Sequence, residues 1–320
     1  EPRAFDSLEM RWLDPLERAA SAEYDLSKRY FGGESFPFVD THIGPGSLAT
    51  MLGSKPGFHW NTVWYNPCIA DLENHPPLAF DPDSEWFKKH VAILEESVCR
   101  SRGRYLVSMP DLIENIDTLA SLRGSEQLMM DLIEQPEIVH RRLAEINQVY
   151  FQVFDALYER IKTPWGGNVF SAFCIWGPGK TAKVQCDAAA MISPDMFGEF
   201  VVPYLTEQCQ WLDYALFHLD GVQCICHLDQ LLAVAPLKAI QWTPQAGVPP
   251  VGDSRWFDLY KRILDGGKSV QILGIQPERV EPVLKAIGTK GVFMSVFLHT
   301  EFEARSICEL VERYRSVERA

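Results

Sequence analysis

The stretch LDYALFHLDGVQCICHLDQLLAVAPLKAIQW (residues 212–242) has the pattern of one strand–helix–strand unit. Apolar residues dominate 212–218 and 238–242, and the segment between them, 227–237, carries leucine and valine at helical spacing. Strands that alternate with helices are typical of parallel βαβ units, in which each helix carries the chain back to the start of the next strand. The stretch therefore predicts an α/β fold built on a parallel sheet.

The same alternation continues on both sides of this unit. Further strands are expected at 36–40, 104–109, 167–173, 269–274 and 291–298, and one more around 61–65, in a region rich in Pro and Asn. Amphipathic helices are expected at 127–148, 194–212, 277–287 and 301–315. Such a series without a linker favours a single (β/α)8 TIM barrel over residues 35–320. Residues 1–34 are expected to form an N-terminal helical extension that ends at Gly32 and Gly33.

Charge and cysteine content exclude several classes of protein. The 320 residues include 30 Lys and Arg against 43 Asp and Glu, which gives a net charge of −13. An acidic surface repels phosphate groups, so neither a nucleic-acid partner nor an anionic membrane surface is expected. The eight cysteines are too sparse for a disulfide scaffold, and no apolar run approaches the length of a membrane-spanning helix. We expect a reducing, cytoplasmic environment.

The carboxyl ends of the strands are where the active site of a TIM barrel lies. His218 is the last residue of the strand at 212–218, and Asp220 follows two residues later. The period of two places both side chains on one side of the strand. His299 follows the strand at 291–298. Two histidines and an aspartate at one mouth are a possible ligand set for a divalent metal. The alternative is a structural hydrogen bond or a polar contact with substrate.

Other polar and aromatic residues follow neighbouring strands in the same way. The members of this group are His42, Asp111, Asp187 and Glu301, with Trp176 and Trp242 near predicted loops. Tryptophan near strand-end loops can wall a flat apolar pocket or simply pack on the rim. The run GPGKT (177–181) lacks the first glycine of a phosphate loop, because Cys174 stands in that place.

The run QCDAAAMISPDMFGEFVVPYL (185–205) resembles the segment after the fourth strand in the uroporphyrinogen decarboxylase superfamily. The segments FHLDG, GVPPVGD and VQILGIQPERVEPVLKAIG (270–288) follow in the order that the superfamily has. The resemblance covers roughly 104–315, and weakly 36–53. It implies a (β/α)8 barrel, which agrees with the strand count, and it makes a homodimer plausible.

The superfamily contains two unlike chemistries. The decarboxylases grip substrate carboxylates with arginines after the first strand, whereas this chain has DTHIGPG (40–46) there, with no arginine. The zinc-dependent methyltransferases, which work with a methylated corrinoid protein, hold zinc with His-x-Cys after the fifth strand and Cys after the eighth. This chain has His218-Leu219-Asp220 and His299 at those places. Such a ligand set is harder than a thiolate set and is more typical of sites that activate water or oxygen ligands.

The resemblance therefore suggests a metal-dependent, methyltransferase-like enzyme with a corrinoid protein as partner. Zinc or a similar ion would be bound by His218, Asp220 and His299. Asp187 and Glu301 would orient ligands or serve as acid and base, His42 and Asp111 would contact substrate, and Trp176 and Trp242 would form walls. Two alternatives stay open: a metal-free lyase or decarboxylase on a non-porphyrin carboxylated substrate, and a barrel that binds a ligand without turnover.

Overall fold

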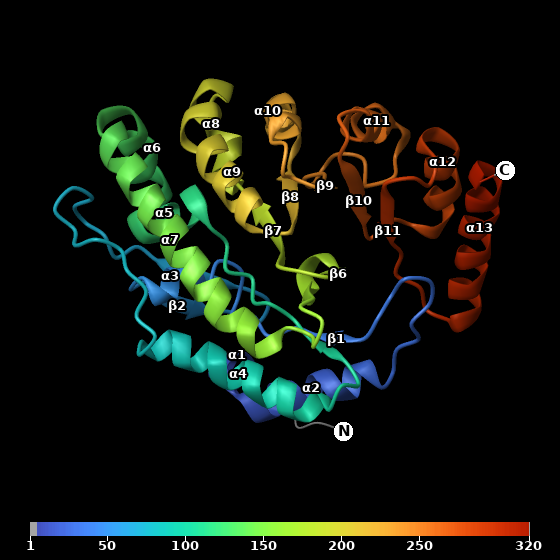
Figure 1. Cartoon of the computed structure of the whole chain (residues 1–320), viewed down its shortest axis with the longest axis horizontal. Helices are drawn as coiled ribbons and strands as arrows, with labels where there is room; N and C mark the ends of the chain where they lie inside the picture. The colour runs from blue at the N-terminus through green and yellow to red at the C-terminus, as the bar shows by residue number, and fades with distance from the viewer. Residues whose placement is uncertain (1–4, 320) are drawn as a thin grey trace.

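A parallel five-stranded sheet is the largest sheet of the protein, whose computed structural model describes residues 5–319 (Figure 1). Residues 1–4 of the expected helical extension and residue 320 of the expected barrel lie outside this range. The strand order is β11-β10-β9-β8-β7, and all neighbours are parallel. The strands are β7 (Thr181–Gln185), β8 (Tyr214–Asp220), β9 (Ala239–Thr243), β10 (Ser269–Leu273) and β11 (Val292–Ser295). The predicted α/β class with a parallel sheet is confirmed, and we call this sheet the second arm.

Shorter strands form a first arm, composed of β1 (Phe38–Val39), β4 (Leu106–Val107), β5 (Asn168–Phe170) and β6 (Ile175–Gly177). Strand β1 pairs in parallel with β4, and an isolated parallel bridge joins Ser108 to Val169 of β5. Strand β6 folds back antiparallel onto β5. The side chain of Asn168 then reaches the second arm, because it bonds to both the N–H and the carbonyl of Thr181.

The two arms together form an open curve. In the range 5–319, β11 pairs with β10 and β1 pairs with β4, and no pairing joins β11 to β1. A closed ring of eight strands is therefore not seen. A segment that we call the strap (residues 30–35) crosses this opening: Glu34 forms an ion pair with Arg315 at 2.6 Å, and the Arg305 guanidinium lies 5.4 Å from the Tyr30 ring centroid.

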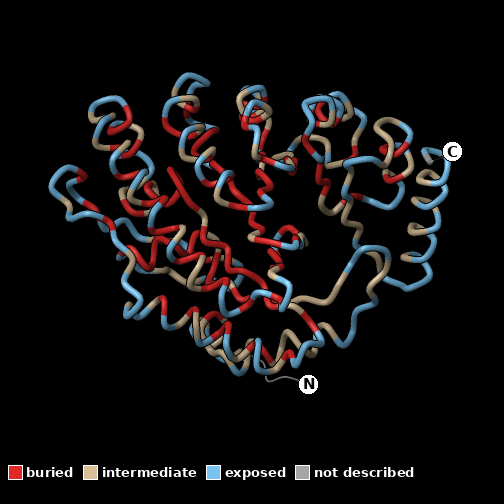
Figure 2. The backbone as a smooth tube through the Cα atoms, in the orientation of Figure 1, coloured by how far each residue is buried: buried red, intermediate tan, exposed pale blue. Residues whose placement is uncertain are grey.

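Helices cover the outer side of the curve, and the buried residues lie on the strands and on the helix faces that pack against them (Figures 1 and 2). Two short helices within the range of the expected extension, α1 (Leu8–Leu13) and α2 (Pro15–Leu26), begin at Ser7 and Asp14, whose side chains accept hydrogen bonds from the first turn. The others are α3 (Leu48–Met51), α4 (Glu85–Ser101), α5 (Asn115–Arg123), α6 (Ser125–Glu134), α7 (Pro136–Ile161), α8 (Pro194–Phe200), α9 (Val202–Trp211), α10 (Leu228–Ala233), α11 (Phe257–Asp265), α12 (Pro277–Ile287) and α13 (Glu301–Arg319). None of the helices described is both long and apolar enough to cross a membrane.

The strand expected around 61–65 is not part of the parallel sheet. It is β3 (Val63–Asn66), which pairs antiparallel with β2 (Lys55–Phe58) in a separate hairpin. A backbone bond from His59 N–H to the carbonyl of Thr62 closes the turn. Two strands joined by so short a connection must be antiparallel, so this segment cannot supply a parallel barrel strand.

Within the parallel five-stranded sheet, the strand that the sequence did not predict is β7. Its alternate positions are polar, and Thr181, Lys183 and Gln185 are all buried. Proline also divides two helices that were expected to be continuous: α6 ends before Pro136, and α8 gives way to α9 just before Pro203. Proline has no N–H to continue the helical ladder, so each new helix starts with it in the first turn.

Candidate metal centre

One row of residues across the second arm is polar. Gln185 of β7 is the register partner of His218 on β8, which is the partner of Gln241 on β9, which in turn is the partner of Gln271 on β10. The three glutamines are buried, and His218 is partly buried. Apolar residues on the opposite faces of the same strands belong to the core, because side chains alternate along a strand.

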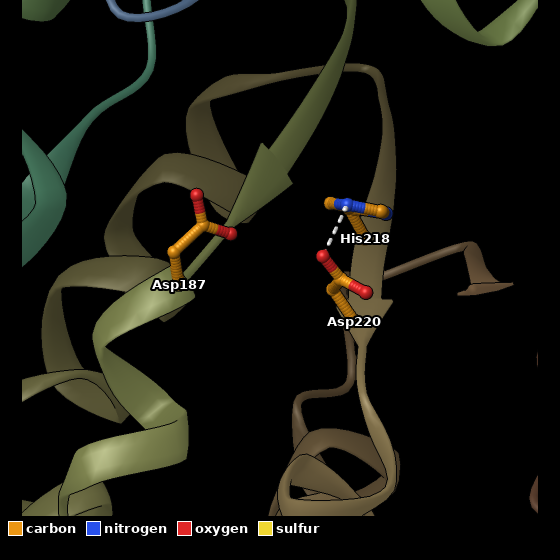
Figure 3. Close-up of side chains that lie close together, drawn as sticks. All are labelled: Asp187, His218 and Asp220. Carbon is orange, nitrogen blue, oxygen red and sulfur yellow. Dashed lines mark ion pairs between the residues drawn. The ribbon is translucent and has the colours of Figure 1, made fainter. Parts of the chain in front are cut away.

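Three side chains meet where β7 and β8 end (Figure 3). Asp187 follows β7, while His218 and Asp220 lie on one face of β8. One ligand atom from each residue lies within 4.8 Å of the others, and His218 Nε2 is 3.8 Å from Asp220 Oδ2. The chain turns at Gly221, whose φ of +84° is readily adopted only by glycine. This group could hold a divalent cation.

His218 is oriented by Gln241. The Gln241 amide nitrogen donates two hydrogen bonds, one to the carbonyl of Trp242 and one to Thr243 Oγ1, each at 2.8 Å. The amide oxygen therefore faces His218 Nδ1, 2.5 Å away, and must accept a hydrogen bond from it. The proton lies on Nδ1, which leaves the Nε2 lone pair directed toward the two aspartates. This is the arrangement in which a histidine binds a metal.

Asp187 is held by two side chains that sequence reasoning missed. Gln185 Nε2 donates to Asp187 Oδ2 at 2.8 Å. Asp117 of α5 accepts the backbone N–H bonds of Asp187 at 2.7 Å and of Ala188 at 3.0 Å. The turn that carries Asp187 is therefore fixed both from its own strand and from α5, the helix that follows β4 of the first arm.

Beside the polar row, Lys183 of β7 is a buried cation with several carboxyl groups near it. Lys183 Nζ lies 2.9 Å from Asp111 Oδ1 and also donates to Gln185 Oε1. Burial raises the pKa of Glu114, which lies beside Lys183, to about 8. Burial and the charge of Asp187 raise the pKa of Asp117 to about 6.

Burial shifts the pKa values of both Asp187 and His218. Desolvation is the main cause that raises the pKa of Asp187; Asp220 adds to it, whereas His218 and Lys183 oppose it. Desolvation also lowers the pKa of His218, which favours the neutral imidazole. A neutral imidazole is the form that binds a metal or accepts a proton.

The structure does not bring His299 to this group. His299 lies exposed in the loop before α13, and its N–H bonds to Glu303. Its strand, β11, is three strands away from β8, which at about 4.8 Å per strand is roughly 14 Å. Glu301 is also exposed and forms an ion pair with Arg305. Asp187, and not His299, is the third side chain that lies close to His218 and Asp220.

The other predicted residues have separate surroundings. His42 Nε2 lies 3.0 Å from Asp40 Oδ2, whereas Asp111 reaches the polar row through Lys183. Trp176 is half exposed on β6. Trp242 is fully buried beside Trp256, on the opposite face of β9 from Gln241, so it packs in the core and is not a wall of the candidate metal centre.

A signal for the missed residues exists in the sequence. The run TAKVQCD (181–187) has a polar residue at every second position, which is typical of a strand with one polar face. That pattern points to Lys183 and Gln185 together with Asp187. For Asp117 and Gln241, which act through contacts between elements, the sequence has no comparable signal.

Comparison with known proteins addresses the fold. No family model matches the chain, and no curated protein matches it. Among solved structures, a methyltransferase from Methanosarcina mazei superposes with a TM-score of 0.60 at 12% identity, over 96% of this chain and 86% of that one. The chain shares its fold with this solved structure.

Proposed function

We propose that this protein is a divalent-metal-dependent enzyme of the methyltransferase type, with Asp187, His218 and Asp220 as the metal ligands. The observation that carries the proposal is the convergence of these three side chains at the carboxyl ends of β7 and β8. The fold that the chain shares with a methyltransferase supports the same class of reaction. In this proposal the open curve of strands corresponds to a TIM barrel of the uroporphyrinogen decarboxylase superfamily.

The residues present fit a divalent ion. Two carboxylates balance its charge, and His218 presents the lone pair of Nε2 because Gln241 holds Nδ1. With three protein ligands, positions stay open for a substrate or a nucleophile, as in catalytic zinc sites. A bound zinc or similar ion would supply Lewis-acid activation there. The set contains no thiolate, so it departs from the His-x-Cys zinc site of the methyltransferase branch.

A methylated corrinoid protein is the methyl donor in this proposal, and it would dock over the carboxyl ends of β7 and β8. The exposed carboxylates of Asp187 and Asp220 lie on that side. The donor is tested with methylcobalamin. Transfer of the methyl group to an added thiol, which gives up its proton to the solvent, breaks the Co–C bond, leaves the electron pair on cobalt and produces the absorption of cob(I)alamin.

Metal content is the decisive first measurement. We expect the purified protein to bind about one Zn²⁺ or Co²⁺ per chain, and His218→Ala to lose at least about a hundredfold in affinity, since removing a ligand costs more than removing a supporting residue. His75→Ala, which changes a partly buried histidine outside this group, is the matched control. A wild-type protein that binds no divalent metal would contradict the proposal.

A metal-free lyase is the second candidate, and the proximity of Asp187 to His218, whose ligand atoms lie within 4.8 Å of each other, favours it. Desolvation raises the pKa of Asp187, and a carboxyl group that keeps a proton beside an imidazole can serve as an acid. Turnover of a carboxylated substrate that survives exhaustive chelation would favour this candidate over the metal enzyme.

A further inference from the structure

The tip of the hairpin between β5 and β6 lies inside the open curve of strands (Figure 1). The tip consists of the short helical turn Ser171–Phe173 and of Cys174, which adopts a φ of +52° and turns the chain back. Ser171 and Phe173 are buried. A non-glycine residue in this left-handed region is uncommon, and the surrounding contacts must hold it.

One side of the tip is tied to the first arm. Ser171 Oγ donates to Asp40 Oδ1 at 2.7 Å, at the end of β1. The backbone N–H of Ser171 donates to Ser108 Oγ at 2.8 Å, at the end of β4. These bonds fix the position of the tip relative to the two strands that make up the beginning of the fold.

The other side of the tip is tied to the second arm and touches the metal centre. Gln271 Nε2 of β10 donates to the Phe173 carbonyl at 2.7 Å. The Phe173 ring packs edge-on against the His218 ring, with centroids 5.0 Å apart at 68°. Lys183 Nζ lies 5.8 Å from the centroid of the same ring.

The tip is therefore in contact with both arms at once, in a protein whose arms are not joined by pairing of β11 with β1 in the range 5–319. We infer that the Ser171–Phe173 tip is a positioning element for His218, through which the first arm sets the metal affinity of the second. The inference rests on the proposed function. Ser171 and Phe173 act through His218 and touch no ligand atom of the proposed metal themselves, so they are positioning residues.

Gln241 alone does not fix the imidazole. A hydrogen bond at Nδ1 defines where the ring edge lies, but the ring can still tilt about that bond. The Phe173 edge packs on the ring and removes this freedom. If the tip shifts with the first arm, the direction of the Nε2 lone pair shifts as well, and coupling of this kind must act in both directions.

The test measures Co²⁺ affinity and the visible spectrum of the Co²⁺ protein by calorimetry and absorption. We expect Ser171→Ala to weaken Co²⁺ binding at least about fivefold, the lower limit of typical coupling between sites. Phe173→Leu is expected to weaken it at least about tenfold and to change the spectrum, as loss of a supporting contact does. Ser171→Thr keeps the hydroxyl group and is expected to retain the wild-type affinity.

Ser101→Ala is the matched control, because Ser101 is a buried serine on α4 with its own hydrogen bond to the Val98 carbonyl. Thermal unfolding of each variant shows whether the variant is folded. If Phe173→Leu does not fold, the Co²⁺ affinity of Ser171→Ala alone tests the inference. Unchanged Co²⁺ affinity in Ser171→Ala, in a wild-type background that binds Co²⁺, overturns this inference alone. A wild-type protein that binds no Co²⁺ overturns the proposed function and this inference with it.

Discussion

The two arms of the sheet differ in how they contribute to the candidate metal centre. The second arm is continuous over five parallel strands, and its register aligns Gln185, His218 and Gln241 in one polar row. The first arm has strands of two or three residues and contains an antiparallel hairpin. It supplies the surroundings instead, because Asp111 and Asp117 follow β4 and reach the polar row from outside. The regular strands and the turn after β7 thus carry the proposed ligands, and the less regular arm holds them in place.

The largest effect is expected where the two arms share a buried charge pair. Lys183→Met removes the partner of Asp111 and leaves a buried carboxylate unpaired, which costs about 3–5 kcal/mol of unfolding free energy. Urea denaturation measures it. The double variant Lys183→Met/Asp111→Leu removes both charges and is expected to recover most of the loss. A single variant as stable as the wild type would show that the arms are not joined by this pair.

Because Glu114 lies in the contact between the arms, its protonation makes the stability of the folded protein depend on pH. Its Oε1 accepts the N–H of Gln185, and burial raises its pKa to about 8. The folded protein therefore binds the proton more tightly than the unfolded chain, so this stabilisation is complete below about pH 4 and is lost as the pH rises through 8.

Glu114→Gln keeps the acceptor and removes the titration. Between pH 5 and pH 8, we expect the unfolding free energy of the variant to rise relative to that of the wild type, by at most about 1.4 kcal/mol per pH unit. Unfolding free energies at the two pH values measure the difference. Equal slopes for the two proteins would show that Glu114 is ionised in the folded state.

The same contrast explains what the sequence could predict. Strands β8 and β9 follow from their apolar runs, and the period of two correctly places His218 and Asp220 on one side of β8. Strand β7 was missed because Lys183 and Gln185 interrupt its apolar pattern, although they are buried. Burial of a lysine depends on Asp111, about seventy residues earlier in the chain, so local periodicity cannot reveal it.

The proposed ligand set shows the same limit. Sequence reasoning assigns an orienting or acid–base role to Asp187 and the place of the third ligand to His299. The choice between them depends on strand order: β7 is the neighbour of β8, whereas β11 lies three strands away. Order in a sheet results from long-range packing, and the positions of histidines along the chain do not encode it.

A smaller effect is expected inside the second arm itself, at Gln241. Gln241→Leu leaves His218 Nδ1 without an acceptor, and we expect metal affinity to fall about 10- to 100-fold, as for other residues that orient metal-binding histidines. Gln241→Glu keeps an acceptor and is expected to retain binding. Calorimetric titration with Zn²⁺ measures both. An unchanged affinity in Gln241→Leu would show that β9 plays no part in orienting the ligand.

The smallest effect is expected at the opening between the arms, where the strap crosses to α13. The Glu34–Arg315 pair is 2.6 Å long but largely exposed, and exposed pairs contribute about 0–1 kcal/mol. Glu34→Ala should therefore change the unfolding free energy by less than about 1 kcal/mol, while hydrogen exchange of residues 30–35 rises. Glu312→Ala, which removes a neighbouring partner of Arg315 within α13, is the control and should leave exchange in the strap unchanged. A loss well above that limit would mean that the strap, rather than the hairpin tip and the Lys183–Asp111 pair, holds the arms together.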